Sequence, residues 1–430
     1  MADKTNKKKV DLIVIGAGLA GLAATCFAVG RGLKTIQIGA TPGEIGFASG
    51  ALDLLGIHPV DQKKTWEDPW AGITALINDC PEHPYARLSI EKIRKALKEF
   101  LTSLKTAGLT YNGLPDRNSI MATCAGTLKT TYRVPQSMWH GVLGLKENRP
   151  ALIVDFEGMK DFSARQMVEV LGSQWSGLKA ERLPFPYSFM GADRYNPLMA
   201  EALGSSKVRT KLAKAILPIL SNAELVGIPA ILGLRQTEEI VSDLETQIGV
   251  PVFEIPTLPP SVPGLRLKET MESNLKKKGA DLLPLRRVLE VSSNGKHCVN
   301  VITGNANFQE PLEANGFVLA SGRFIGGGLI AKHSSIIEPL LGLHVHQPKE
   351  RSYWHREQFF DSQSHPVNKA GLLIDNQFRP LMKNGDFAFE NLFVAGSILA
   401  HQDWVRMKCG TGLAVATAWG AVDSFIRCCL

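Results

Sequence analysis

An apolar run that passes directly into a glycine-rich turn is the strongest constraint on this chain. Residues 12–21 read LIVIGAGLAG, so a strand over 12–15 would end at Gly16 in the pattern G-x-G-x-x-G. In this pattern Gly16 permits the tight turn, Gly18 lets the backbone approach a phosphate, and Gly21 lets the next helix pack close to the sheet. A helix over 19–29 and a second strand over 34–38 complete the unit. The sequence therefore predicts a Rossmann-like α/β domain that binds a dinucleotide or flavin at a helix N-terminus.

The end of the second strand departs from the usual fingerprint. An acidic residue about 20 positions after the turn normally binds the adenosine ribose, but this chain has Gly39-Ala40-Thr41 there, and the nearest acid is Glu44. Either an adenosine ribose would lack its acidic partner, or Glu44 replaces it from the following loop. FMN is therefore a candidate cofactor beside FAD.

Size and composition favour two compact domains. The 430 residues exceed the limit of about 250–300 for one core, and 44% hydrophobic with 21% charged residues is typical of folded interiors. The net charge of +7 comes from scattered Lys and Arg, which indicates a solvated surface. We find no apolar run of transmembrane length, no secretion signal and no aromatic-basic stripe for nucleic acid.

The cysteines give no sign of a metal or an iron–sulfur cluster on this chain. Seven are present without any C-x-x-C grouping, as suits a reducing cytoplasm. Zinc spacing is absent as well. Cys409 precedes a glycine pair, where it has either a packing role or a redox role. Any cluster that works with this chain is therefore expected on a partner.

A second α/β block interrupts the first domain. Residues 151–154 form a new apolar strand after Pro150, helical periodicity covers 197–220 and 238–247, and no glycine phosphate loop occurs in this block. The segment 256–264 is too proline-rich for a helix and suits a rigid crossing. We expect a discontinuous flavin-binding domain at 1–149 and 265–430, with an inserted α/β cap or substrate domain at 150–264.

Glycines after three strands mark where backbone would pass the cofactor. Apolar strands near 317–320 and 391–395 each open into glycine, a helix over 413–426 follows a glycine pair, and the small residues of 45–53 suit contact with a ring system. The expected cofactor-binding residues are Gly16, Gly18, Gly21, Ser49, Gly50, Gly322, Gly396, Ser397, Gly410, Thr411 and Gly412.

These strand-to-glycine elements around an inserted domain resemble the succinate dehydrogenase and fumarate reductase type of flavoprotein. Within that group, the segments SGALDLL (49–55), HPY (83–85), GTL (126–128), LPPSVPGLRL (258–267) and SG (321–322) resemble the B subunits of anaerobic glycerol-3-phosphate dehydrogenases. The basic arm over 1–9 and the charged, aromatic segment 401–408 depart from the pattern.

The resemblance implies a noncovalent FMN, with FAD as the alternative, and a flavin-dependent oxidoreductase. It implies partners as well: the larger flavoprotein A subunit, together with the iron–sulfur C subunit, through which electrons from sn-glycerol 3-phosphate reach a menaquinone pool. The chain would then be cytoplasmic and peripheral at the inner face of the membrane. Two alternatives remain: an electron-transfer or assembly subunit without turnover, and a soluble fumarate or enone reductase.

Oxidation of a secondary alcohol that carries a phosphate needs a base and a cation. The segment 344–365 supplies histidines and Arg351, and His365 resembles the histidine before the glycine pair in fumarate reductase-type enzymes. We expect Arg351 and His365 as catalytic residues, against a structural role for each. His344 and His346 alternate along a strand, which favours a surface or partner contact.

Overall fold

The computed structural model describes residues 9–187, 194–305 and 307–430. By packing, the chain forms two compact units. The first comprises Met1–Glu44, Asp53–Gly108 and Thr270–Leu430, and the second comprises Ile45–Leu52 and Leu109–Glu269. Whether 150–264 acts as a cap over a flavin stays a prediction.

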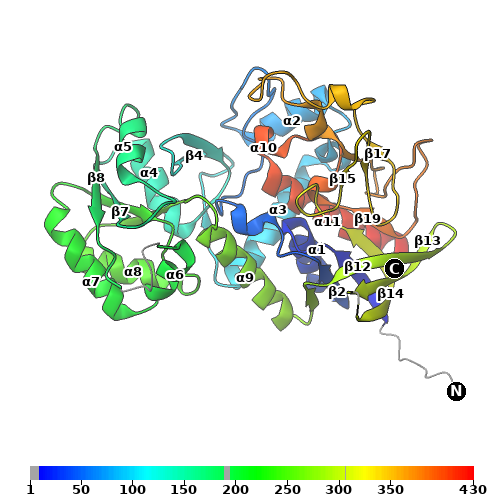
Figure 1. The fold of residues 1–430 in the computed structure, drawn as a ribbon, viewed down its shortest axis with the longest axis horizontal. Coiled ribbons are helices and arrows are strands. Elements are labelled where there is room, and N and C mark those ends of the chain that lie inside the picture. Colours follow the sequence, from blue (N-terminus) through cyan, green and yellow to red (C-terminus); the bar gives the residue numbers. More distant parts are fainter. Residues whose placement is uncertain (1–8, 188–193, 306) are drawn as a thin grey trace. The chain divides into compact units, whose positions relative to one another are not determined.

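A mixed sheet forms the centre of the first unit (Figure 1). Its strand order is β11-β2-β1-β14-β13-β12, with β19 also paired to β14. The strands β11, β2, β1, β14 and β19 run parallel to one another, whereas β13 runs antiparallel to both of its neighbours, β14 and β12. The strands are β1 (Lys9–Ile15), β2 (Thr35–Gly39), β11 (Asp281–Pro284), β12 (Arg287–Asn294), β13 (His297–Gly304), β14 (Gln309–Leu319) and β19 (Leu392–Val394).

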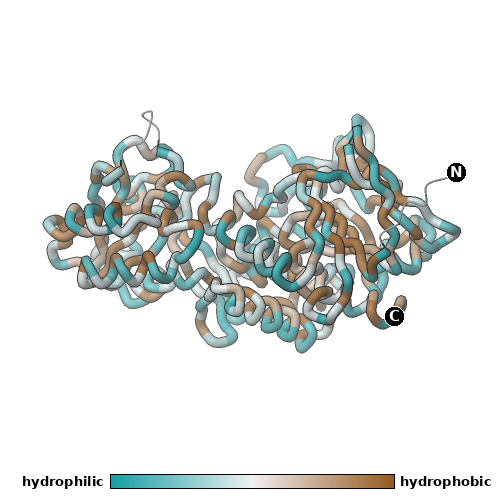
Figure 2. Tube along the Cα trace, turned by 90° about the horizontal axis from the view of Figure 1, so that it is seen from below, coloured by the Kyte–Doolittle hydropathy of each residue, from teal (hydrophilic) through white to brown (hydrophobic). Residues whose placement is uncertain are grey.

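Three helices pack together in this unit: α1 (Leu19–Gly30), α3 (Ile90–Thr106) and α11 (Gly410–Cys429). Nine consecutive residues of α1 are buried, whereas α3 buries one face at helical spacing. Arg31 of the α1 C-cap binds Glu99 of α3 at 2.8 Å, and Trp419 of α11 donates to the same carboxylate at 2.9 Å. Figure 2 shows the hydrophobic segments gathered in the interior of this unit.

The second unit contains a parallel sheet in the order β10-β9-β7-β8. Its core includes the buried rings of Phe156, Trp175 and Phe253. The strands are β7 (Ala151–Phe156), β8 (Leu178–Leu183), β9 (Leu225–Pro229) and β10 (Val252–Ile255), and the helices are α4 (Trp139–Glu147), α5 (Ala164–Leu171), α6 (Asn196–Ala202), α7 (Ser206–Ile216) and α8 (Thr237–Ile248).

Two helical expectations differ from the structure. The periodicity of 197–220 is divided between α6 and α7, because Ser205 adopts an extended N-cap conformation between them. The proline-rich segment 256–264 is partly helical, because α9 (Val262–Lys277) begins within it. Pro263 is tolerated because the first helical turn has no partner for its missing N–H, and the Ser261 hydroxyl accepts a hydrogen bond from Gly264 N at 3.2 Å.

Shorter elements complete the described part of the chain. They are α2 (Pro69–Asp79), α10 (Trp404–Met407), β3 (Tyr111–Asn112), β4 (Ser119–Ala122), β5 (Leu128–Thr131), β6 (Val134–Pro135), β15 (Ile330–Ala331), β16 (Ile336–Ile337), β17 (Val345–His346) and β18 (Gly371–Leu372). Within the described ranges, no helix combines the length and the apolar character needed to cross a membrane.

Candidate functional site

The glycine-rich turn between β1 and α1 contains two glycines that the fold itself requires. Gly16 has a φ of +133°, and a Cβ there would lie 2.1 Å from the Ala320 carbonyl oxygen. At Gly21 a Cβ would lie 2.0 Å from the Gly16 carbonyl oxygen. These contacts bring the end of β14 and the first turn of α1 against the same backbone.

Gly18 differs from both, because nothing in the described part of the protein requires a glycine there. It is the N-cap of α1 with a φ of −76°, no side chain caps the helix, and a Cβ would have no heavy atom within 4 Å. The first N–H groups of a helix lack intrahelical partners and attract anions. A helix N-terminus that has no capping side chain, with a glycine at its N-cap, therefore leaves room for a phosphate group.

The end of β2 has no room for the missing ribose acid. A Cβ at Gly39 would lie 2.3 Å from the Ala17 Cβ, and Gly43 would bring a Cβ to 2.8 Å from the Ala17 carbonyl oxygen. Buried Gln37 donates from Nε2 to the Gly16 carbonyl at 2.9 Å. Close packing of β2 and the following loop on the phosphate turn explains why glycine stands at position 39.

Glu44, the nearest acid, is half-buried beside the loop that follows β14. Burial raises the pKa of its carboxyl, while the Arg323 charge and a hydrogen bond from Gly326 N–H act in the opposite direction. The Glu44 carboxyl therefore interacts with the loop after β14, in which Arg323 and Gly326 lie. That it replaces the ribose acid stays a prediction.

The loop after β14 carries polar atoms without partners. The Ser321 hydroxyl and the Arg323 Nε are buried and make no hydrogen bond within the described residues. Gly322 has a φ of +74°. The remaining nitrogens of Arg323 donate to the carbonyl oxygens of residues 367, 368 and 370 at 2.6–3.0 Å. Arg323 thus ties this loop to a segment almost 50 residues away, a role that its sequence context does not indicate.

The third strand-to-glycine element, after β19, meets the first turn of α1. Gly396 has a φ of +85°, and a Cβ there would lie 2.6 Å from the Ala20 Cβ. Its N–H donates to the Thr417 hydroxyl at 2.9 Å, and the Ser397 carbonyl accepts from Gln402 Nε2 at 2.9 Å. The structure therefore brings Gly396 beside the first turn of α1, which follows Gly16 and Gly18.

The glycine pair at the start of α11 has packing reasons of its own. A Cβ at Gly410 would lie 2.9 Å from the Trp404 ring, and one at Gly412 would lie 2.6 Å from the Tyr85 hydroxyl. Half-buried Thr411 lies between them. Preceding Cys409 is fully buried, and burial raises its thiol pKa, so the reactive thiolate is disfavoured.

Ser49 and Gly50 belong to the second unit and are described within it. The Ser49 hydroxyl accepts from Lys129 Nζ at 3.2 Å. Gly50 has a φ of +83°, and its carbonyl accepts from the Tyr111 hydroxyl at 2.8 Å. Contact of either residue with a flavin stays a prediction.

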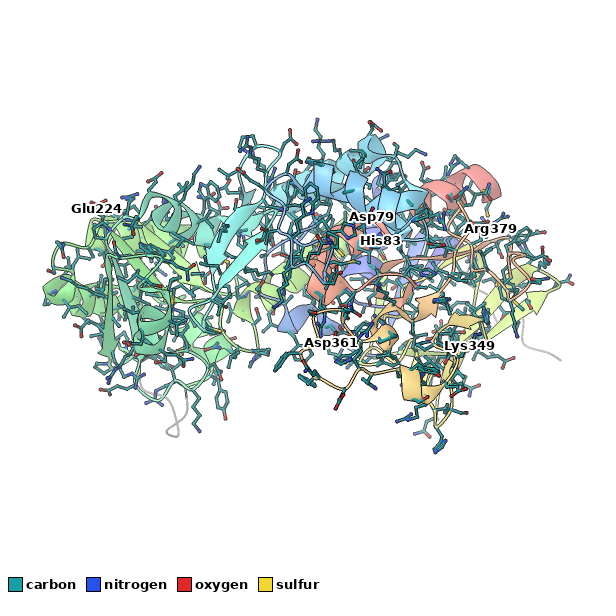
Figure 3. All side chains as sticks on the ribbon, turned by 90° about the horizontal axis from the view of Figure 1, so that it is seen from above. Asp79, His83, Glu224, Lys349, Asp361 and Arg379 are labelled. Atoms are coloured by element: carbon teal, nitrogen blue, oxygen red, sulfur yellow. The ribbon has the colours of Figure 1, made fainter. Side chains whose placement is uncertain are left out.

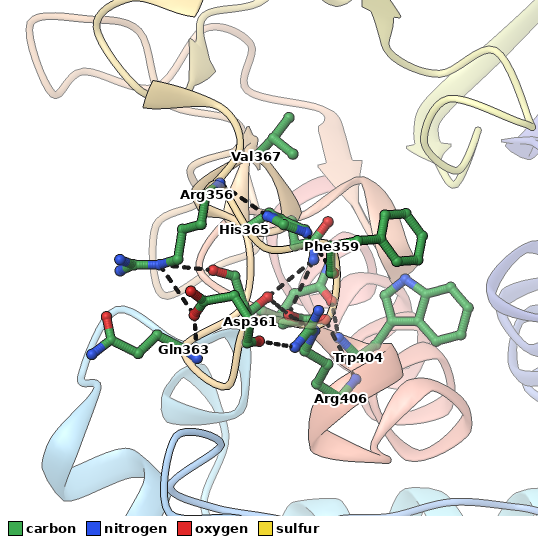
Figure 4. Close-up of polar contacts among 12 residues, drawn as sticks. Arg356, Phe359, Asp361, Gln363, His365, Val367, Trp404 and Arg406 are labelled. Atoms are coloured by element: carbon green, nitrogen blue, oxygen red, sulfur yellow. Dashed lines mark hydrogen bonds and ion pairs between the residues drawn. The ribbon is translucent and has the colours of Figure 1, made fainter. Parts of the chain in front are cut away.

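The two expected catalytic residues lie in the segment 351–369 of the first unit. Exposed Arg351 donates to the Lys332 carbonyl at 3.1 Å and packs over the Trp354 ring. His365 Nδ1 accepts from Arg356 N at 3.1 Å, and His365 Nε2 lies 3.0 Å from the Phe359 carbonyl (Figure 4). Both ring nitrogens of His365 are therefore engaged within its own loop.

A polar network attaches this loop to the segment around α10. Asp403 accepts from Ser364 and, at 3.3 Å, from Asn368, while Arg406 donates to the Asp361 carbonyl (Figure 4). Sequence patterns did not indicate this network because its members are separated by about 40 positions. Two of its five members, Asp403 and Arg406, are charged residues of the segment 401–408, which departs from the family pattern.

The family model for an FAD binding domain matches residues 11–413. The B subunit of an anaerobic glycerol-3-phosphate dehydrogenase from Vibrio vulnificus is 31% identical over 96% of this chain and 95% of its own length. Subunits of the same name from Vibrio cholerae and Yersinia pestis are 28% and 29% identical, each over 97% of this chain and covering 96% and 98% of their own lengths. The chain belongs to this flavoprotein family. The predicted resemblance is confirmed, and with it a flavin-dependent oxidoreductase.

Solved structures with a related arrangement are more distant. A 3-ketosteroid Δ1-dehydrogenase from Sterolibacterium denitrificans covers 98% of this chain and all of its own, with a TM-score of 0.45 and 11% identity. A flavocytochrome c3 fumarate reductase gives the same score and identity, with 98% of this chain and 79% of its own covered.

The residues present fit the flavin that the family implies. Gly18 and the uncapped α1 N-terminus would hold a phosphate, and the unpartnered Ser321 hydroxyl would meet a further polar group of the cofactor. A bound flavin supplies the two-electron redox chemistry that amino-acid side chains lack. Among the described residues, no group of three or more His, Cys, Asp or Glu side chains is arranged to hold a metal ion.

Proposed function

We propose that this chain is the flavin subunit of a quinone-linked dehydrogenase that oxidises sn-glycerol 3-phosphate to dihydroxyacetone phosphate. The oxidation removes two electrons and two protons from the alcohol, and partner subunits pass the electrons to a menaquinone pool. The observation that carries the proposal is the match to B subunits of this enzyme over 96% of the chain. The anion-binding geometry at Gly18 supports it independently.

FMN, bound noncovalently, is the proposed cofactor, with FAD as the alternative. The packing of Gly39 against Ala17 supports FMN, because the usual acidic partner of an adenosine ribose has no space at that position. Glu44 is the residue that would favour FAD if it took over the ribose contact.

A second candidate function is electron transfer or assembly without turnover on this chain. It is favoured by the contacts of one Arg351 nitrogen, Nη1, and of both His365 ring nitrogens with the surrounding backbone. The two functions differ in one measurement. Anaerobic addition of sn-glycerol 3-phosphate to the isolated, flavin-loaded chain bleaches the flavin if oxidation occurs here and leaves it oxidised if it occurs on a partner.

Variants of the two proposed catalytic residues sharpen this test. If Arg351 binds the substrate phosphate, Arg351→Ala should remove a charge-assisted contact worth about 1.5–3 kcal/mol and weaken apparent affinity about 10- to 100-fold. If His365 is a general base, His365→Ala should slow flavin reduction about 100-fold. Stopped-flow reduction of the assembled complex measures both, with His333→Ala as an exposed control. Wild-type affinity and rates in the two variants would contradict both catalytic roles and would support the electron-transfer function.

Partner subunits are proposed to dock on an exposed aromatic pair in the middle of the 351–369 segment. Phe359 and Phe360 are 78% and 87% exposed, and their rings pack edge to face at 4.9 Å. The surrounding polar network holds this loop in place (Figure 4). Exposed aromatic pairs on an ordered loop are typical interface anchors. The relatives are named as B subunits, which supports an assembly with the larger flavoprotein A subunit, together with the iron–sulfur C subunit, through which the chain would sit at the inner membrane face.

We expect Phe359→Ser combined with Phe360→Ser to reduce recovery of the partner subunits about 30-fold, as loss of an anchor worth about 2 kcal/mol implies. Tagged chain co-expressed with its partners and recovered by affinity purification provides the measurement. Phe308→Ser, which changes an exposed phenylalanine elsewhere in the first unit, is the control. Undiminished recovery of both partners in the double variant would place the interface elsewhere.

A further inference from the structure

Four basic residues from separate segments of the first unit gather around His401 or act on it electrostatically. They are Arg87 at the end of a short helix (Pro84–Arg87), His346 in β17, Lys369 at the end of another (Pro366–Lys369), and His401. The rings of His346 and His401 lie 4.3 Å apart between centroids. The positive charges of Lys369 and Arg87 both act on His401. We call these four residues the basic cluster.

Buried donors beside the basic cluster have no partner. The Nε of Arg87 is buried without a hydrogen bond among the described residues, and so is the Nε2 of His83. His83, labelled in Figure 3, is fully buried, and its Nδ1 accepts from Tyr85 N at 3.2 Å, so the proton lies on Nε2. The Lys369 charge and the His401 ring both act on His83. An unmet buried donor destabilises the folded protein unless a ligand satisfies it.

The backbone at His401 is held in an unfavourable conformation. Its φ of +59° lies in the left-handed region, which residues other than glycine rarely adopt. Hydrogen bonds enforce it: His401 N donates to the Lys369 carbonyl at 3.0 Å, and Gln402 Nε2 donates to the Ser397 and Leu399 carbonyls at 2.9 Å. These hydrogen bonds fix the direction in which the His401 side chain leaves the backbone.

The two nearby carboxylates, Glu82 and Asp79, do not neutralise the basic cluster. Exposed Glu82 raises the pKa of both His346 and His401, but burial and the neighbouring cations outweigh it, so both pKa values are lowered. The other nearby acid, Asp79, binds His58 at 2.8 Å. Permanent charge on Lys369 and Arg87, imidazoles that gain charge as pH falls, and unmet buried donors together favour a small anion.

We propose that Arg87, His346, Lys369 and His401 bind the phosphate group of a small phosphate monoester. Guanidinium, ammonium and imidazole donors match the terminal oxygens of such a group. The identity of the ester as sn-glycerol 3-phosphate rests on the proposed function, and the basic cluster then takes the place of Arg351 as the site of its phosphate. The anion site itself does not depend on that function. His401 follows the Gly396-Ser397 turn by four residues, so one loop connects this site to the predicted flavin contact.

Calorimetric titration of the flavin-loaded protein with inorganic phosphate, and then with sn-glycerol 3-phosphate, tests the site without relying on turnover. Lys369→Ala and His401→Asn should each weaken phosphate binding about 10- to 100-fold. Asparagine is chosen because it tolerates the left-handed backbone of His401. Exposed Lys349→Ala and His355→Ala are matched controls and should bind as wild type does. Flavin content and the unfolding midpoint show that each variant is folded.

A pH series with sulfate, which stays doubly charged, isolates the contribution of the histidines. Binding should weaken as pH rises through the pKa values of His346 and His401, which lie below the ordinary 6.5, because both imidazoles lose their protons there. His344, Glu82, Lys369 and Arg87 are the other charged or titratable groups that act on these two rings. Saturable phosphate binding that the two cluster variants weaken supports the site. If phosphate binds but sn-glycerol 3-phosphate binds no more tightly, the site stands and the proposed substrate is wrong. Absence of saturable phosphate binding, or equal affinity in all variants, overturns the site.

Discussion

Replacement of Gly18 with valine is expected to remove the bound flavin almost completely while the fold survives. A Cβ at Gly18 has no protein atom within 4 Å, and the φ of −76° suits any residue, so the larger side chain strains nothing in the chain itself. The same side chain would occupy the space in which the α1 N-terminus meets a phosphate. Loss of that contact removes the anchor for the cofactor.

Two neighbouring substitutions should behave in the opposite way. Gly16→Ala and Gly21→Ala place a methyl group about 2 Å from the carbonyl oxygens of Ala320 and Gly16, so both should lower the unfolding midpoint before any effect on binding is considered. Gly30→Val is the matched control, since Gly30 ends the same helix and also has open space around its Cβ position.

Absorbance of the purified proteins, acid precipitation and chromatography of the released flavin give the measurement. The wild-type chain should release FMN into the supernatant, Gly18→Val should release almost none, and Gly30→Val should match the wild type. A Gly18→Val protein with full flavin content would contradict the phosphate site. Release of FAD would contradict the FMN proposal alone, and flavin that stays in the pellet would contradict noncovalent binding.

The start of the fold could be predicted from sequence because its determinants are local. Strand, turn and helix over 9–30 follow from neighbouring residues, and the structure differs only in starting the strand at Lys9 and ending the helix at Gly30. The structural role of each glycine could not be predicted from neighbouring residues in the same way. Gly16 is required by Ala320 and Gly412 by Tyr85, and neither partner is near in sequence. The pattern therefore predicted a cofactor site but did not separate the glycines that serve packing from Gly18, which has open space around its Cβ position.

Interactions between distant segments explain what sequence reasoning missed. The basic cluster joins residues 87, 346, 369 and 401, and no spacing rule relates these positions. His346 was expected at a surface or partner contact because only its own strand could be considered. Arg323 follows a strand-to-glycine element, and its guanidinium binds three carbonyl oxygens more than 40 residues away. Side-chain function here depends on which loops the fold brings together.

A buried ion pair in the second unit gives the largest expected effect on stability. Arg266 and Glu254 are 3% and 2% exposed and form two hydrogen bonds of 2.9 and 3.0 Å. Leu232 N also donates to the Glu254 carboxylate at 2.7 Å, and Arg266 donates to the Gly233 carbonyl. Glu254→Gln keeps the shape but leaves the Arg266 charge buried without a counter-charge. It should therefore destabilise the second unit by about 3–5 kcal/mol.

The same pair makes the stability of the second unit sensitive to acid. Burial raises the pKa of the Glu254 carboxyl, but Arg266, Ser137 and Leu232 N–H lower it by more, so the folded pKa lies below its ordinary value. The contribution is therefore fully present above the unfolded pKa of about 4.3 and is lost as pH falls through the folded value. Glu254→Gln should remove this part of the acid sensitivity.

Urea unfolding at several pH values, combined with hydrogen exchange of β9 and β10 amides, measures both effects in the unit concerned. Glu224→Gln is the control, because its pair with Arg149 is exposed and should contribute less than about 1 kcal/mol. Adding Arg266→Met to Glu254→Gln should recover part of the loss, since it removes the uncompensated charge while keeping similar volume. If Glu254→Gln alone were no more destabilising than Glu224→Gln, the pair would not hold β10 to the start of α9, and the stability of the second unit would have to come from its apolar core.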